Sequence, residues 1–216
     1  YHKCCGGRTE IYSTCWEDKN YPYLQSVEGP YCNPIHYPQS TIHISLNDYD
    51  CSTLNYHDWV VEYTQEELSE IVRKKTGTDF GLIPDLIPLH RGASGRIDRL
   101  EIVGTKHREV IGKELRIRQA LSKTTLYSSW FEIEKSFSDS GLSAIEEYRS
   151  RRSDQRSGLS GEASPARFRL RGHGWGHGVG LCQIGAAVMA QQGFTYKQIL
   201  AHYYRNTEIS CFCRKS

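Results

Sequence analysis

Long apolar runs are missing from this sequence, and so is a marked excess of charge of either sign. No stretch approaches the roughly 20 apolar residues that a bilayer-spanning helix needs, so we expect no transmembrane segment in the chain. The 27 basic and 25 acidic residues leave a formal net charge of +2. A nucleic-acid-binding protein usually carries a basic face or stripe, so this balance argues against nucleic acid as a partner.

Methionine is nearly absent, because Met189 is the single one in 216 residues. Tyr1 is therefore not an encoded start, and we expect the chain to be a piece of a longer precursor, with no signal peptide or lipid-attachment segment visible in it. Hydrophobic residues make up 38% and charged residues 24%, which is ordinary for a globular protein. The length allows one large domain or two small ones, each with its own core.

Cysteine, by contrast, is abundant. The eight cysteines are Cys4, Cys5, Cys15, Cys32, Cys51, Cys182, Cys211 and Cys213. Their even number favours an oxidising compartment and at least two disulfides, mostly among the first five, with a separate pairing of Cys182 with Cys211 or Cys213. Zinc is a weaker alternative, since no two cysteines have the two- or four-residue spacing typical of zinc sites. Free thiols are the third alternative.

Local patterns predict a mixture of helices and short strands. Residues 1–57 lack periodicity and are expected to form loops and short strands tied by cysteines. A hairpin is predicted over 94–112, a short helix over 113–121 and a strand over 126–137. The polar segment 150–165 is poor in apolar residues and is expected to be a mobile insertion loop.

Two helix starts carry a complete N-terminal signal. Thr64 with Glu67 forms a capping box before a helix that Gly77 should end, and Thr195 with Gln198 forms another. A further helix is predicted directly after Gly180. We therefore expect an α+β fold of short strands, hairpins and a few helices, in which a glycine-rich strand leads into a C-terminal helix pair.

The most unusual stretch is "RGHGWGHGVGLCQIGAA", residues 171–187, with glycine at every second position from 172 to 180. In an extended strand this alternation places His173, Trp175, His177 and Val179 on one face and bare backbone on the other. Such a glycine face admits another backbone or a flat ligand. The N–H groups of the following helix's first turn offer a place for a polar or anionic group.

Ligand binding is one of several roles that would account for this stretch. A glycine-rich strand packed under a helix can simply be a tight core crossing with Trp175 buried. In a strand, His173 and His177 would share a face, so their spacing would also allow both histidines to bind one metal ion. A phosphate-binding loop is disfavoured, because no Lys-Ser/Thr follows the glycines.

Several motifs, in this order, resemble the SpoIID/LytB family of stage II sporulation protein D and the amidase enhancers. They are "CCGGRTE", "YPYLQSVEGPYC", "SGRIDRLEI", "KELRIRQAL", "YSSWFEIE" and the long "GHGWGHGVGLCQIGAAVMAQQGFTYKQILAHYYRNTEI". The resemblance covers nearly the whole chain, so 1–216 would be one such domain without its N-terminal part, with 150–165 as an insertion.

This resemblance implies an exported bacterial cell-envelope protein that acts on peptidoglycan glycan strands. Sporulation members are lytic transglycosylases, in which one Glu protonates the glycosidic oxygen and the sugar's 6-hydroxyl closes on the anomeric carbon. That Glu belongs to a Gly-Glu-Met-Pro-like motif upstream of "CCGGRTE". A Cys/His cluster that binds zinc in some members also lies upstream. Neither is in these residues, so no catalytic residue, metal or cofactor is assigned to this chain, and the chain alone should lack the general acid. Glu10 is expected to be a surface or capping carboxylate.

The resemblance also points to the glycine stretch as the glycan cleft. The predicted substrate-binding residues are His173, Gly174, Trp175, Gly176, His177, Gly178 and Gln183. Aromatic and hydrogen-bonding groups at a concave site suit sugar rings. Two rival functions are a non-catalytic peptidoglycan-binding module that enhances a partner amidase, and a structural envelope domain with a degenerate cleft.

Overall fold

The computed structural model describes residues 1–33, 57–137 and 165–210. Within these parts the chain is an α+β protein with two antiparallel three-stranded sheets, which confirms the predicted fold class. Most of the segment 150–165, predicted to be a mobile loop, lies outside the described residues. None of the helices in the described parts is both long and apolar enough to cross a bilayer.

The first sheet has β6 (Arg167–His173) at its centre, with β1 (Asp58–Thr64) and β5 (Phe131–Ser136) on its two sides. Side chains along β6 alternate between exposed and buried, so that Phe168 and Leu170 face the core while the arginines between them face solvent. This is the period of two that a half-buried strand requires.

The second sheet follows the order β2 (Asp85–Arg91), β3 (Ile97–Val103) and β4 (Arg108–Ile111). The predicted hairpin over 94–112 is confirmed as β3 and β4, which pair antiparallel. Strand β2 contains Pro88, which has no N–H to donate, and it accordingly lies at the edge of the sheet.

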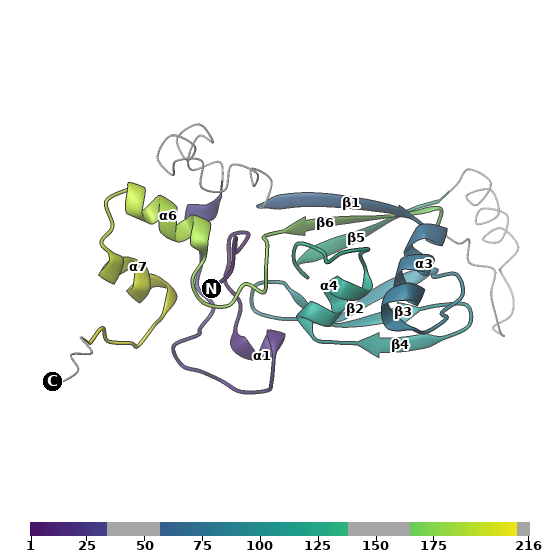
Figure 1. Cartoon of the computed structure of the whole chain (residues 1–216), viewed down its shortest axis with the longest axis horizontal. Coiled ribbons are helices and arrows are strands. Elements are labelled where there is room, and N and C mark those ends of the chain that lie inside the picture. Colours follow the sequence, from purple (N-terminus) through teal and green to yellow (C-terminus); the bar gives the residue numbers. More distant parts are fainter. Residues whose placement is uncertain (34–56, 138–164, 211–216) are drawn as a thin grey trace, which may run out of the picture.

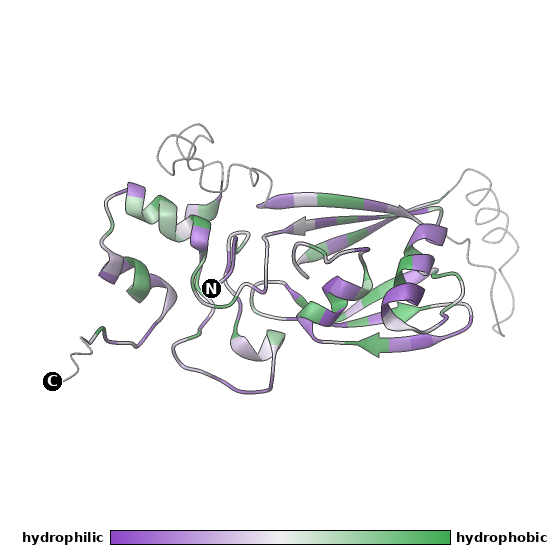
Figure 2. Cartoon of the chain, in the orientation of Figure 1, coloured by the Kyte–Doolittle hydropathy of each residue, from purple (hydrophilic) through white to green (hydrophobic). Residues whose placement is uncertain are grey.

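Helices α3 (Gln65–Thr76) and α4 (Glu114–Ala120) pack against the sheets and share one core with both of them (Figure 1). The Thr64 capping box at the start of α3 is confirmed, and Gly77 ends that helix in a left-handed conformation. Polar and apolar residues alternate around α3, as expected for a helix with one buried face (Figure 2).

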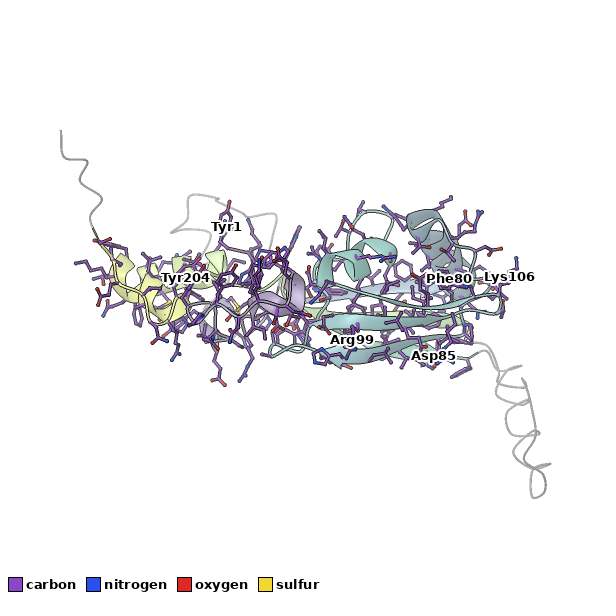
Figure 3. The ribbon with its side chains drawn as sticks, turned by 90° about the horizontal axis from the view of Figure 1, so that it is seen from below. Tyr1, Phe80, Asp85, Arg99, Lys106 and Tyr204 are labelled. Atoms are coloured by element: carbon purple, nitrogen blue, oxygen red, sulfur yellow. The ribbon has the colours of Figure 1, made fainter. Side chains whose placement is uncertain are left out.

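The other half of the molecule holds the N-terminal segment, α1 (Tyr12–Cys15), the short 3-10 helix η1 (Pro30–Cys32), α6 (Gln183–Gln191) and α7 (Tyr196–Tyr203) (Figure 1). Tyr1 and Tyr204 lie in this half, away from Phe80 and Lys106 at the far end of the sheets (Figure 3). The predicted C-terminal helix pair and its second capping box are confirmed.

No disulfide joins the five cysteines in the described parts of the chain, Cys4, Cys5, Cys15, Cys32 and Cys182. The expectation of disulfides is therefore wrong for these five, although all are buried. The sulfur atoms of Cys5 and Cys32 are 3.1 Å apart, well beyond the roughly 2.05 Å of an S–S bond. Cys51, Cys211 and Cys213 lie outside the described residues.

Candidate functional site

The glycine stretch is a strand only as far as His173, where β6 ends. Beyond it, Gly174, Gly176, Gly178 and Gly180 have φ of +74°, +99°, +84° and +72°. Residues with side chains rarely adopt this left-handed backbone, so glycine at every second position is what the turns require. The prediction of one continuous extended strand with two faces is therefore wrong after His173.

The space beside each of these glycines is filled by other groups of the protein. A Cβ atom built on Gly174 would lie 2.8 Å from the carbonyl oxygen of Cys4, and one on Gly178 would lie 2.5 Å from Cζ of Arg96. At Gly172 the ring of Trp59 takes this space. The close approach predicted for the glycines thus exists, and in this structure the approaching groups belong to the chain itself.

Arg96 is fully buried at the centre of this arrangement. Its guanidinium donates to the hydroxyl of Ser94 (2.9 Å) and to the carbonyl oxygens of Cys5 (3.2 Å) and Gly176 (3.3 Å). Arg96 therefore links the N-terminal segment to the glycine stretch. Arg96 lies within the "SGRIDRLEI" motif, but the motif does not predict which distant carbonyl groups its guanidinium contacts.

His173 belongs to a cluster at the edge of the first sheet. Asp58 is 2.6 Å from Nδ1 of His173 and 2.8 Å from Nδ1 of His57. The pKa of Asp58 is lowered overall. Partial burial alone would raise this pKa, but the hydrogen bonds from His57 and His173 have the larger combined effect. The three residues place metal-ligand atoms within 4.8 Å of one another. His57 and Asp58 were not singled out from the sequence, because no motif contains them.

His177 lies apart from His173 and contacts other partners. Its Nδ1 accepts a hydrogen bond from the N–H of Val179 (3.0 Å), and its ring is 4.9 Å from that of Trp16. Burial lowers the pKa of His177 to about 4, with contributions from the charges of the terminal amino group of Tyr1 and of Arg96. The imidazole is therefore neutral at pH 7. His177 and His173 thus have different hydrogen-bond partners.

A row of aromatic side chains continues from His177 along the surface. Trp16 is 4.9 Å from Tyr12, Tyr12 is 4.8 Å from Tyr21, and Tyr21 is 5.7 Å from Tyr23, measured between ring centres. Trp16 and Tyr23 are about 40% exposed. We call these four residues the aromatic row. Sequence reasoning did not assign it a function, although its residues lie among the motifs at the start of the chain.

Trp175 contacts a separate aromatic residue on the other side of the glycine stretch. Its ring is 4.9 Å from that of Tyr127, in an edge-to-face arrangement. Its backbone pairs with Cys4 in both directions, through bonds of 2.8 and 3.1 Å. Trp175 is half-buried rather than fully enclosed. A core role and a ligand contact are thus compatible at this position.

The first turn of α6 has no N–H group left for an anion. The N–H groups of Gln183 and Ile184 donate to the carbonyls of His2 and Lys3, at 3.0 and 3.2 Å. The N–H of Gly185 donates to Sγ of Cys182, the N-cap residue. The predicted anion site at this helix start is therefore wrong, because the N-terminal segment occupies it.

Glu10 is fully buried, which corrects the expectation of a surface position. Its carboxylate accepts five hydrogen bonds. The donors are the N–H groups of Ile11, Ala93 and Ser94 and the hydroxyls of Thr14 and Ser94. A carboxylate held in this way joins α1 to the loop before β3, and these five bonds engage both of its oxygens.

The predicted substrate-binding residues differ in what they expose. His173, Trp175, Gly176, His177 and Gln183 are partly exposed, whereas Gly174 and Gly178 are buried. A ligand can therefore reach the first five, while the two buried glycines shape the turn that presents them. A branched side chain at Gly176 would be strained whatever space is available, because of its positive φ.

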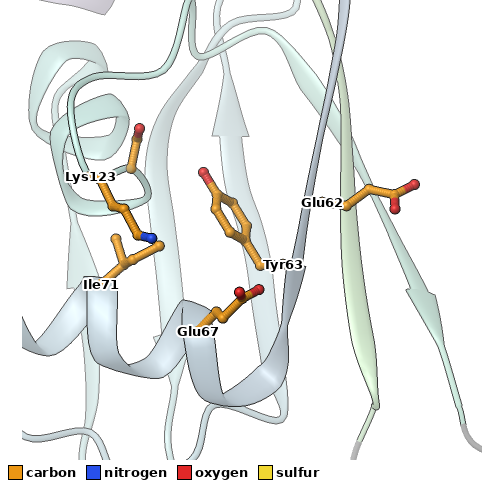
Figure 4. A pocket seen from close by; sticks show the side chains of 6 residues that line it. Glu62, Tyr63, Glu67, Ile71 and Lys123 are labelled. Atoms are coloured by element: carbon orange, nitrogen blue, oxygen red, sulfur yellow. The ribbon is translucent and has the colours of Figure 1, made fainter.

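A pocket of about 220 Å³ lies elsewhere, at the end of β1 far from His57. Tyr63, Glu67, Ile71 and Lys123 surround it, while Glu62 points away from them (Figure 4). It contains none of the predicted site residues, and the glycine stretch remains the candidate site.

Two comparisons with known proteins show what the chain is similar to. The chain is 51% identical over 37 residues to stage II sporulation protein D of Bacillus amyloliquefaciens, a match that covers 17% of this chain and 11% of that protein. The chain thus matches only a small part of that relative's length. A family model described as a domain of unknown function, DUF8618, matches residues 10–180. The chain therefore belongs to the DUF8618 family.

Proposed function

We propose that this chain binds the glycan strands of peptidoglycan in the bacterial cell envelope, as part of a lytic transglycosylase. The observation that carries the proposal is the glycine stretch, whose His173, Trp175, His177 and Gln183 are partly exposed and whose His177 contacts the aromatic row. Aromatic rings and hydrogen-bonding groups together match the apolar faces and hydroxyl rims of sugars. The local similarity to a sporulation protein supports the same assignment.

Hydrogen bonds hold the backbone of the glycine stretch in place, so that little conformational entropy would be lost when a ligand binds. The glycine stretch is hydrogen-bonded to segments from four places, through Cys4, His57, Arg96 and Tyr127. A site whose loop is already ordered loses less entropy when a ligand binds. The proposal therefore assigns Gly174 and Gly178 to holding the loop and the partly exposed residues to contacting sugar.

The chemical step needs a proton donor next to the glycosidic oxygen. Near the glycine stretch, the described carboxylates are already engaged: Glu10 accepts five hydrogen bonds and Asp58 is bonded to two histidines. In the proposal the general acid therefore comes from residues outside this chain, and the chain alone binds glycan without cleaving it.

A second candidate function is a non-catalytic wall-binding module that enhances a partner amidase. The same engagement of Glu10 and Asp58 favours it, because a binding module needs no acid. The two candidates are distinguished by the products formed from purified sacculi by the full-length protein. Fragments ending in 1,6-anhydro sugars support the transglycosylase, whereas binding without such fragments supports the module.

Binding itself is tested on this chain with a sacculus pull-down. Trp16→Ala removes an exposed ring of the aromatic row, and an aromatic contact of about 1 kcal/mol corresponds to a roughly fivefold loss of affinity. Tyr196→Ala is the matched control, since Tyr196 is an exposed aromatic residue on α7. Equal binding by the two variants would contradict the proposed site. A wild-type chain that does not bind sacculi would contradict the proposed function.

A further inference from the structure

Four cysteine side chains from three separate segments meet in the interior. Cys4 and Cys5 come from the N-terminal segment, Cys32 from η1, and Cys182 from the position before α6, and each is at most 1% exposed. They belong to one buried cluster with Met189 and Tyr203, among others. We call these four residues the thiol cluster.

Three of the four sulfur atoms lie close together. Sγ of Cys5 is 3.1 Å from Sγ of Cys32, and Sγ of Cys5 and of Cys182 lie within 4.8 Å of each other. Cys4 belongs to the same buried cluster. In a tetrahedral zinc site with Zn–S bonds of about 2.3 Å, neighbouring sulfurs are about 3.8 Å apart. The sulfurs of Cys32 and Cys182 therefore each lie near that of Cys5 at roughly the spacing of zinc ligands.

The backbone around Cys182 places hydrogen-bond donors at its sulfur. Its Sγ accepts hydrogen bonds from the N–H groups of Cys5 and Gly185, both at 3.3 Å. Cys182 is also the N-cap of α6, where the helix dipole stabilises negative charge. Arg96 supplies a positive charge nearby, since its guanidinium donates to the carbonyl of Cys5. These groups offset part of the negative charge that three thiolates bring.

His2 borders the thiol cluster and gives a second sign of a ligand. Its Nδ1 donates to the carbonyl of Val179 (3.2 Å), while its buried Nε2 has no hydrogen-bond partner among the described residues. A ring nitrogen of His2 lies within 4.8 Å of the sulfurs of Cys5 and Cys182. A buried imidazole whose other nitrogen is fixed by a carbonyl is the usual arrangement near a bound metal.

We infer that Nε2 of His2 and the thiolates of Cys5, Cys32 and Cys182 bind a structural zinc ion. Binding releases three protons as Zn²⁺ replaces the hydrogens of three thiols, and with a neutral imidazole the complex has a charge of −1. Four protein ligands close the coordination sphere, so the ion would act on stability and not on catalysis. It would join the N-terminal segment and η1 to the start of α6, directly after the glycine stretch. The site is independent of the proposed glycan binding.

Metal content of the purified chain tests this directly. Protein produced with zinc and kept reduced should contain one zinc per chain by mass spectrometry of the metal. Substituting cobalt should produce the charge-transfer and visible bands of a tetrahedral cobalt–thiolate complex. A zinc-selective chelator should lower the melting temperature, and added zinc should restore it. A wild-type chain without zinc, or one with a Cys5–Cys32 disulfide in its place, would overturn the inference.

Substitutions identify the ligands. Cys5→Ser, Cys32→Ser and Cys182→Ser should each weaken zinc binding at least tenfold, whereas Cys15→Ser should retain one zinc. Cys15 is the matched control, because it is also buried but bonds to the carbonyl of His177 instead. A triple Ser variant of Cys51, Cys211 and Cys213 should also retain the ion, and its loss there would overturn the assignment.

Two further variants distinguish His2 from Cys4 as the fourth ligand. His2→Gln should lose zinc and Cys4→Ser should keep it. The reverse result would overturn this ligand set in favour of four thiolates. Should a Cys→Ser variant fail to fold, the cobalt spectrum of the wild-type chain still reports the number of thiolates by the intensity of its charge-transfer band.

Discussion

The guanidinium of Arg96 lies where a side chain of residue 178 would be, because a Cβ atom built on Gly178 would be 2.5 Å from Cζ of Arg96. The same group donates to the carbonyl of Gly176, two residues earlier. The glycine stretch and Arg96 thus require each other: the arginine fits only beside glycine, and its hydrogen bonds hold the turn.

Gly178→Ala should therefore cost more than the backbone strain alone. Gly77→Ala is the matched control, since Gly77 has a similar φ of +76° but nothing within 4 Å of its missing Cβ. We expect the control to lose about 1 kcal/mol of unfolding free energy from strain. Gly178→Ala should lose about 2 kcal/mol more, because Arg96 must move. Urea unfolding measures both, and equal losses would contradict the packing role of Arg96.

Glu10→Gln should destabilise the fold strongly. The amide replaces one carboxylate oxygen with an NH2 group that faces the N–H and hydroxyl donors of Ala93, Thr14 or Ser94. Burying such an unsatisfied arrangement costs about 3 kcal/mol. Glu28→Gln, at an exposed ion pair with Arg8, should change little. A Glu10→Gln protein as stable as wild type would show that these hydrogen bonds contribute nothing.

Stability should fall between about pH 6.5 and pH 4 because of His177. Its pKa is about 4 in the folded chain and about 6.5 when unfolded, so the contribution is complete above pH 6.5. Below that, the unfolded chain binds a proton that the folded chain does not, and the loss reaches about 3 kcal/mol near pH 4.

His177→Gln tests this, because Gln does not titrate and its side-chain oxygen can still accept a hydrogen bond from Val179. Unfolding free energy measured across this pH range should depend less on pH in the variant than in wild type. His2 is retained in both proteins, so the slope should be reduced and not abolished. Identical slopes would assign the acid sensitivity to other groups.

Removing a helix cap should cost a smaller amount. Thr64→Ala and Thr195→Ala each delete the oxygen that accepts from the third residue of the helix, and each should lose about 1 kcal/mol. Thr124→Ala, at an exposed position, serves as the control. Thermal melting resolves these differences, and a Thr195 variant that melts like the control would place the stability of α7 in its packing alone.

The local elements of this protein are determined by residues close together in the sequence. Thr64 and Glu67 form the capping box that their spacing predicts, and so do Thr195 and Gln198. The hairpin of β3 and β4 likewise follows its alternating pattern and its turn. These predictions succeeded because the hydrogen bonds concerned join residues only a few positions apart, or adjacent strands with a short connection.

Tertiary structure alone decided the character of the candidate site. The conformation of Gly178 depends on Arg96, and the burial of Glu10 depends on Ala93 and Ser94, each some 80 positions away. The thiol cluster joins distant residues such as Cys5 and Cys182, which are 177 positions apart, so cysteine spacing within one segment could not reveal it. Such contacts form when distant segments pack together, and a pattern of neighbouring residues carries no signal of which distant group will fill the space beside a glycine or meet a buried thiol.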